Sequence, residues 1–222
     1  MPNVMLNKEN LEIIKHLEPC DYNEMWEFQK KRNHDVRQSG TKECIIFLQH
    51  KPVYTFGFHA DENNLLICPE QLLTLGVPIF RIERGGDVTF HGPGQLVVYL
   101  IIDLNKRGYG IKEFVSRVEQ SVIDTCSRFG IETGRREGAP GVWTAAEKSQ
   151  KICAVGFKVK HGVTMHGLAL NISPDLEYFN FINPCGFKSN SVTSMKKELK
   201  DVDIPSFGLV CDTLEKELLN RI

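Results

Sequence analysis

Apolar and polar positions along the chain repeat with two different periods, which together predict both helices and strands. Helical spacing runs from Tyr22 to Gln38, with Asp21 placed as the N-terminal cap. A second amphipathic stretch, Ile111–Phe129, is followed by Gly130 in the position that closes many helices. A final helix is expected from about Ser206 to Leu219.

Four other stretches carry strand patterns. Cys44–Gln49 and Leu96–Leu104 are short apolar runs, which are typical of strands buried on both faces. Residues 152–160 alternate, and residues 164–172 follow after a short gap. These last two stretches predict a hairpin that turns at His161-Gly162.

The order of these elements bears on the fold class. Lys51–Asn64 contains proline, glycine and polar residues, which predicts a loop. Strands and helices follow one another without the strict strand–helix–strand rhythm of a doubly wound parallel sheet. We therefore expect an α+β fold, with a single domain over residues 1–222 and a mixed sheet.

Composition narrows the functional classes without selecting one. Of the 222 residues, 41% are hydrophobic and 25% are charged, which are ordinary values for a globular protein. The formal net charge of −1 gives no overall sign of nucleic-acid binding. Residues 135–200 nevertheless carry a net charge of +5, and the rest of the chain carries about −6. This basic stretch is either a solvated face or a docking surface for acidic partners.

The cysteines and the apolar runs bear on location. The chain has seven cysteines, an odd number, and no Cys-x-x-Cys pair, which argues against a disulfide framework or a cysteine-rich zinc module. A reducing compartment is the simpler expectation. No apolar run reaches the length of a membrane span. Residues 1–20 contain three glutamates and no apolar signal core, so they predict neither a secretory signal nor a typical transit peptide.

A glycine-rich segment, Arg84–Gln95 (RGGDVTFHGPGQ), carries the first candidate chemistry. Its glycines let the backbone approach a ligand closely, and turn N–H groups can bind an anion or a carbonyl oxygen. Arg84 adds a fixed cationic fork, and His91 adds a titratable ring. The segment lacks the P-loop pattern, and it precedes a predicted strand where a dinucleotide fingerprint would precede a helix. A tight structural turn stays open as an alternative.

Two further segments carry a lysine and a cysteine. Lys151 begins the predicted strand KICAVG, a position that by itself favours a solvent-exposed side chain. Cys185 lies in a Pro-Cys-Gly turn within Ile182–Phe187 (INPCGF), which follows His166–Asn171 (HGLALN). A turn exposes a thiol readily, and its N–H groups could stabilise a thiolate or an oxyanion. On composition alone, a buried structural cysteine is the commoner situation.

Together these segments resemble the lipoyl(octanoyl) transferase family. The family's RGGxxTxHGPGQ, KIxxxG, HGLALN and NPCG patterns occur in the family's order and spacing. The resemblance covers roughly residues 54–194. One departure is Phe58-His59, where the family often has arginine or lysine, and this puts a contact with the carrier protein or its phosphopantetheine arm in doubt.

The resemblance implies an acyltransferase of lipoate biosynthesis. Such enzymes move an octanoyl group from octanoyl-acyl carrier protein to a lysine of lipoyl domains, those of 2-oxoacid dehydrogenases and of the glycine cleavage H protein. Their fold is similar to that of lipoate and biotin protein ligases, with a largely antiparallel mixed sheet flanked by helices. We further expect a monomer without cofactor, metal, nucleic acid or membrane, located in the cytoplasm if the chain is bacterial and in the mitochondrion if it is eukaryotic.

The family's site residues can be carried over onto this sequence. Cys185 would be the nucleophile, and Lys151 would be the acid/base partner that favours its thiolate. We expect His91 and His166 to shape the pocket through hydrogen bonds and not to act as primary bases. The substrate-binding positions would be Arg84, Gly85, Gly86, Asp87, Val88, Thr89, Phe90, His91, Ala154, Val155, Gly156, His166, Gly167, Leu168 and Ala169.

The chemistry agrees with these roles. An octanoyl thioester is already activated, so transfer needs no ATP. The attack needs a thiolate, and an ordinary cysteine is only a few per cent ionised near neutral pH. A nearby ammonium favours the thiolate, while burial favours the neutral lysine, so the two groups titrate as a coupled pair.

Other functions stay open from the sequence. An ATP-dependent lipoate–protein ligase would share the fold and need no nucleophilic cysteine, and an amidotransferase acting between lipoyl domains would differ only in its donor. A metal module of His91, His166 and Cys185 would have spacings that fit no compact zinc motif. A papain-like hydrolase would carry its cysteine early in the chain. A non-catalytic lipoyl-domain binding protein would not need Cys185.

Overall fold

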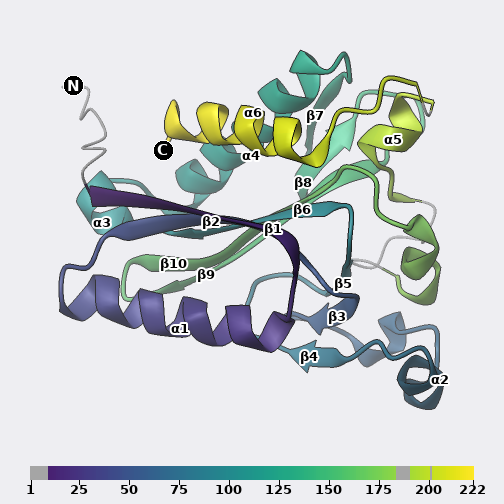
Figure 1. Ribbon diagram of the computed structural model, residues 1–222, viewed down its shortest axis with the longest axis horizontal. Coiled ribbons are helices and arrows are strands. Elements are labelled where there is room, and N and C mark those ends of the chain that lie inside the picture. Colours follow the sequence, from purple (N-terminus) through teal and green to yellow (C-terminus); the bar gives the residue numbers. More distant parts are fainter. Residues whose placement is uncertain (1–9, 184–190, 201) are drawn as a thin grey trace.

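A seven-stranded sheet forms the centre of the computed structural model, which describes residues 10–183, 191–200 and 202–222. Its strands, in spatial order, are β1 (Leu11–Cys20), β2 (Glu43–His50), β6 (Gln95–Ile101), β10 (Val163–Asn171), β9 (Lys151–Lys160), β8 (Ala139–Thr144) and β7 (Thr133–Arg136) (Figure 1). β1 and β2 pair in parallel, and the other neighbouring strands pair antiparallel. The expected mixed, largely antiparallel sheet is confirmed.

Helices cover both faces of this sheet (Figure 1). The helix α1 (Tyr22–Gln38) packs on one face, and α4 (Ile111–Arg128) and α6 (Phe207–Leu219) pack on the other. The layers explain the continuous apolar run of β2, because Ile46 packs towards α1 while Phe47 packs towards α4 and α6. Within the described residues, no helix is long and apolar enough to cross a membrane.

Local signals account for the elements that the sequence predicted well. Asp21 caps α1 by accepting hydrogen bonds from the backbone N–H groups of the first helical turn. Gly130 follows α4 with a φ of 75°, and the N–H of Ile131 donates to the carbonyl of Cys126, so a Schellman motif ends this helix. The predicted hairpin joins β9 to β10 through His161-Gly162, whose φ angles of 49° and 85° suit a type I′ turn.

A second, smaller sheet corrects the prediction of a loop over Lys51–Asn64. The strand β3 (Val53–Phe56) lies between β4 (Ile79–Arg81) and β5 (Val88–His91), and a 3-10 turn covers Glu62–Asn64. Pro52 and Gly57 stand just outside β3, so they bound a strand and do not interrupt one. The small sheet packs on its own apolar cluster, to which α2 (Pro69–Thr74) and the 3-10 helix Leu176–Phe181 contribute.

Two other boundaries differ from the sequence prediction. The strand expected over Leu96–Leu104 ends at Ile101, because Asp103 caps a short helix, α3 (Leu104–Arg107). The edge strand β1 was not predicted. It alternates poorly, since much of it is exposed and it packs beside only one neighbouring strand.

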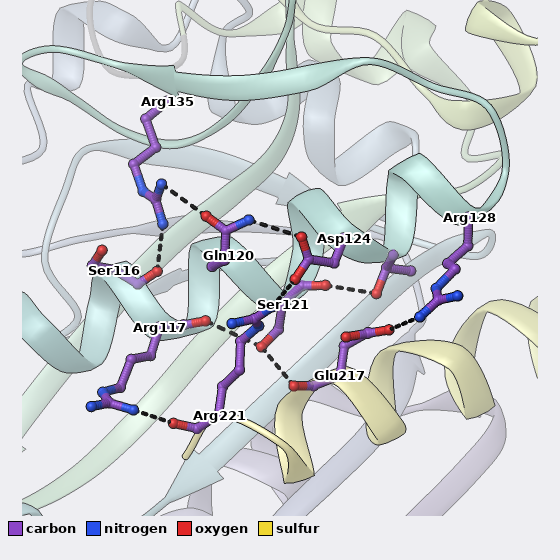
Figure 2. A network of polar contacts seen from close by, with 10 residues as sticks. Ser116, Arg117, Gln120, Ser121, Asp124, Arg128, Arg135, Glu217 and Arg221 are labelled. Atoms are coloured by element: carbon purple, nitrogen blue, oxygen red, sulfur yellow. Dashed lines mark hydrogen bonds and ion pairs between the residues drawn. The ribbon is translucent and has the colours of Figure 1, made fainter.

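Polar contacts fasten the C-terminal helix α6 to α4 (Figure 2). The hydroxyl of Ser121 donates to the carbonyl of Glu217, and Arg117 donates to the carbonyl of Arg221 over 2.8 Å. The Arg221 guanidinium forms an ion pair with Asp124 of α4. These contacts fix α4, whose first turns face the cavity described below.

Candidate active site

A cavity of about 420 Å³ lies where the small sheet meets β9 and β10, within the usual size range of ligand sites. The structure brings the three predicted binding segments together there. All of the predicted substrate-binding residues line this cavity except Asp87 and Phe90, and Lys151 lines it as well.

Asp87 and Phe90 support the cavity wall from behind. The carboxylate of Asp87 accepts hydrogen bonds from the N–H groups of Asp61 and Val88 and from the side chain of Asn64. The ring of Phe90 stacks on Tyr178, with ring centroids 4.4 Å apart, inside the apolar cluster of the small sheet. Both residues act on the shape of the glycine-rich segment.

Two glycines allow the cavity walls to approach one another. The N–H of Gly85 donates to the carbonyl of Phe157, which ties the glycine-rich segment to β9. A Cβ atom at Gly156 would lie 2.9 Å from the carbonyl oxygen of Gly85. At Gly167 a Cβ atom would lie 2.0 Å from the carbonyl oxygen of Val98 on β6, so the strand pairing itself requires glycine there.

A chain of hydrogen bonds begins at Arg84, which is nearly buried. Its guanidinium donates to the backbone carbonyl of Thr55 over 2.7 Å and to the Thr55 hydroxyl over 2.9 Å. The Thr55 hydroxyl lies 3.5 Å from Nε2 of His91. The arginine therefore serves as a fixed cationic part of the wall, held by the small sheet.

The chain of hydrogen bonds continues from His91 to the backbone of Lys151 at the start of β9. Gln95 donates through Nε2 to Asn171, so its Oε1 accepts from Nδ1 of His91 over 2.7 Å. Asn171 donates in turn to the carbonyl of Thr193, and the N–H of Thr193 donates to the carbonyl of Lys151 over 3.0 Å. One polar path thus joins the glycine-rich segment to the lysine.

Burial keeps the histidines of this region neutral. It lowers the pKa of His91 to about 3, with a further contribution from nearby His50. Burial and the Arg84 charge lower the pKa of His166 to about 3, and burial lowers that of His50 to about 4. Rings with such low pKa values are weak bases and serve as neutral hydrogen-bonding groups.

His166 has an unusual backbone within β10. Its φ is +63°, and its N–H donates to the side chain of Gln29 on α1 over 2.8 Å. The ring lies edge-on to Tyr99, with centroids 6.4 Å apart. Its buried Nε2 has no hydrogen-bond partner among the described residues, so this atom can accept or donate a bond to a group inside the cavity.

Lys151 is buried, contrary to the exposed side chain that its position at a strand start favours. Only 9% of the residue is exposed. Among the described residues, the ring centroid of Trp143 of β8 lies 4.8 Å from Nζ, and Val192 forms a β-bridge with the Lys151 backbone. A buried lysine at a cavity wall is a candidate acid/base group.

Cys185, the predicted nucleophile, lies outside the described residues. The chain is described up to Asn183 and again from Ser191. The N–H of Asn183 donates to the carbonyl of Asn64, and Val192 pairs with Lys151.

Several cavity residues were not identified from the sequence. Gln95 and Asn171 are the last residues of two of the quoted motifs and line the cavity. The signal that could have identified them is a polar side chain at the end of an otherwise apolar strand. Tyr22 and Tyr99 join the wall from α1 and β6, and no local pattern pointed to them. The remaining additions are Val97, Ile111, Val115, Gly138, Ala139, Pro140, Phe157, Phe179 and Val192.

Phe58, the departure from the family pattern, stands beside the glycine-rich segment. Its N–H donates to the carbonyl of Arg84, and its side chain is 75% exposed. The ring lies edge-on to His59, with centroids 5.2 Å apart. An exposed aromatic pair thus stands beside the glycine-rich segment.

Glu119 holds the β7–β8 hairpin, whose turn lines the cavity, against α4. Its buried carboxylate accepts from the N–H of Gly141 over 2.8 Å and from Arg135 over 3.1 Å. We expect Glu119→Gln to lower the free energy of unfolding by about 2 kcal/mol, because one buried hydrogen bond and the ion pair are lost. Urea unfolding would measure this.

The matched control for that substitution is Glu113→Gln on the same helix. Glu113 pairs with Arg117 at the surface, so its loss is expected to change the free energy of unfolding by about 0.5 kcal/mol or less. Equal losses in the two variants would contradict the anchoring role of Glu119.

Comparison with known proteins shows the family of the chain. Residues 21–216 match the lipoyl protein ligase A/B catalytic domain. The chain is 48% identical over 178 residues to an octanoyltransferase of Bacteroides fragilis (strain YCH46), covering 79% of each chain. It is 38% identical over 223 residues to an octanoyltransferase of Polynucleobacter asymbioticus, covering 95% of each.

Solved structures share the fold. A bipartite lipoate protein ligase of Thermoplasma acidophilum superposes with a TM-score of 0.72 at 16% identity, covering 95% of this chain and 84% of that one. A biotin protein ligase of Aquifex aeolicus, in complex with biotin and ATP, gives a TM-score of 0.52 at 10% identity, covering 96% of this chain and 70% of that one. The expected likeness to lipoate and biotin protein ligases is confirmed at the level of the fold.

Proposed function

Because the chain belongs to the lipoyl protein ligase A/B catalytic domain family, and within it to the octanoyltransferases, we propose a mechanism of octanoyl transfer through a thioester. In this mechanism Cys185 carries the octanoyl group, and Lys151 is the acid/base partner. The observation that carries this mechanism is the burial of Lys151 at the cavity wall beside Val192. Val192 lies seven residues after Cys185 in the sequence.

Four of the other cysteines are unsuited to be the nucleophile. Cys44, Cys126, Cys153 and Cys211 are buried in the core. Burial raises the pKa of Cys44 and of Cys126 to about 12 and that of Cys211 to about 11, and it raises the pKa of Cys153 well above its usual range. Such thiols stay protonated and are poor nucleophiles.

The first half of the cycle forms the acyl-enzyme. The Cys185 thiolate attacks the octanoyl carbonyl, the bond from that carbon to the donor sulfur breaks, and the departing thiolate takes a proton from the Lys151 ammonium. In the second half, a neutral acceptor amine attacks the thioester. Lys151 takes the proton from this amine, and Cys185 leaves as a thiolate, so both groups return to their starting states.

The protein partners belong to the same proposal. We infer that octanoyl-acyl carrier protein is the donor and that lipoyl domains, with a lysine acceptor, are the recipients. The net charge of +5 over residues 135–200 suits acidic partners, because opposite charges speed association. An octanoyl donor on a second lipoyl domain would use the same chemistry, so donors must be compared directly.

An intact mass measurement tests the thioester. The protein is incubated with octanoyl-acyl carrier protein without ATP and is expected to gain one octanoyl group, which an apo lipoyl domain then removes. Cys185→Ser should give no hydroxylamine-sensitive adduct, whereas Cys68→Ser, at an exposed described cysteine, should behave as the unmodified protein. Transfer that occurs only with ATP would overturn the proposal in favour of a ligase.

A further inference from the structure

The aromatic ring of Trp143 lies against the side-chain nitrogen of Lys151, a residue that lines the cavity. The centroid of the ring is 4.8 Å from Nζ, and Trp143 is 1% exposed. A cation this close to a desolvated indole face is attracted by the negative face of the ring. The contact is therefore a candidate for setting the protonation behaviour of the lysine.

An irregularity in the strand pairing creates this contact. β8 and β9 pair Val142 with Cys153, and the register then shifts so that Trp143 opposes Lys151. Such a bulge turns a side chain from the direction that regular pairing would give it. The indole N–H donates to the carbonyl of Ala139 over 2.9 Å, which fixes the ring in its plane.

We propose that Trp143 is a positioning residue that holds Lys151 in its ammonium form and orients it for proton transfer; this rests on the proposed acid/base role of Lys151. The negative face of the ring stabilises positive charge beside it. Held as an ammonium, the lysine is the proton donor that the sulfur leaving during acyl-enzyme formation needs. Weakening the ring's negative face should make the lysine lose its proton at lower pH.

Other charged groups also act on this region. Arg136 of β7 lies over the same ring, with its Cζ 4.9 Å from the centroid. Glu119 of α4 and Lys151 both act electrostatically on the Cys153 thiol, and Glu198 of α5 (Met195–Glu198) accepts a hydrogen bond from Thr193 beside Lys151. The test must therefore change the ring and leave these charges in place.

Fluorinated tryptophan meets this requirement, because it removes electron density from the ring with little change of shape. The chain has two tryptophans, and Trp26 also lies beside a lysine, with Lys30 Nζ 4.0 Å from its centroid. Trp26→Phe leaves Trp143 as the single tryptophan, and Trp143→Phe leaves Trp26. Each protein is prepared with ordinary, monofluorinated and tetrafluorinated tryptophan.

The measurement is the pH–rate profile of acyl-enzyme formation with octanoyl-pantetheine, followed by intact mass. With Trp143 as the single tryptophan, the basic limb should move to lower pH in proportion to the number of fluorines. The total shift should lie within about 0.4 to 1.5 pH units. In the matched protein that keeps only Trp26, fluorination should leave the basic limb in place.

The outcomes separate this inference from the proposed function. If the adduct forms normally and fluorination of Trp143 does not move the basic limb of the pH–rate profile, the role of the ring is overturned. The thioester cycle would stand in that case. An equal shift in both single-tryptophan proteins would also overturn the role of the ring. If the parent protein forms no thioester adduct at all, the proposed function itself fails.

Discussion

Lys151→Met is expected to slow acyl-enzyme formation by about 10²- to 10⁴-fold, the usual range for loss of a general acid/base group. Methionine keeps the apolar stem of lysine without the terminal nitrogen. Removing a desolvated charge also removes the cost of burying it, so the thermal midpoint should not fall. Single-turnover intact mass and a thermal melt measure the two effects.

Lys160→Met, at the exposed far end of the same strand, is the matched control and should keep its full rate. Lys151→Arg adds a second test, because a guanidinium supports a thiolate but does not release its proton near neutral pH. This variant should form the acyl-enzyme more readily than Lys151→Met and fail to discharge it to a lipoyl domain. A rate within about threefold of the parent for Lys151→Met would exclude the acid/base role.

The elements that the sequence predicted correctly carry signals within a few residues. Asp21 and Gly130 mark the ends of α1 and α4 through contacts inside the same turn, and the His161-Gly162 hairpin needs only its own backbone angles. The errors occur where the partner is distant. β3 looked like a loop because its pairing with β4 and β5 joins residues that are well separated in the sequence.

For the candidate site too, the sequence indicated what depends on local motifs and missed what depends on distant partners. The glycine-rich segment and the residues around Gly156 and Gly167 could be assigned from motifs, and the structure brings them to one cavity. The path from His91 through Gln95 to Asn171 could not be assigned, since it depends on β6 lying beside β10. The ring contact of Lys151 with Trp143 and its β-bridge with Val192 could not be assigned either, since neither residue adjoins it in the sequence.

Acid is expected to unfold the protein steeply, because three buried histidines stay neutral in the fold. Their pKa values are about 4 for His50 and about 3 for His91 and His166, below the ordinary value of 6.5. Below about pH 6.5, the three histidines are therefore protonated in the unfolded chain and stay unprotonated in the folded chain. The stability they contribute is present above that pH and is lost as the pH falls towards the folded pKa values.

Near pH 5 this linkage should remove about 4 kcal/mol of unfolding free energy per pH unit, or about 1.4 for each histidine. Urea unfolding at pH 7, 6 and 5 measures the slope. His50 does not itself line the cavity, although its ring is hydrogen-bonded to the Tyr99 hydroxyl, and His50→Gln should lower the slope by about a third. His34→Gln, at the exposed surface of α1, should leave it unchanged. If His50→Gln keeps the parent slope, His50 is already protonated in the fold, and the neutral hydrogen-bonding role assigned to these rings is wrong for it.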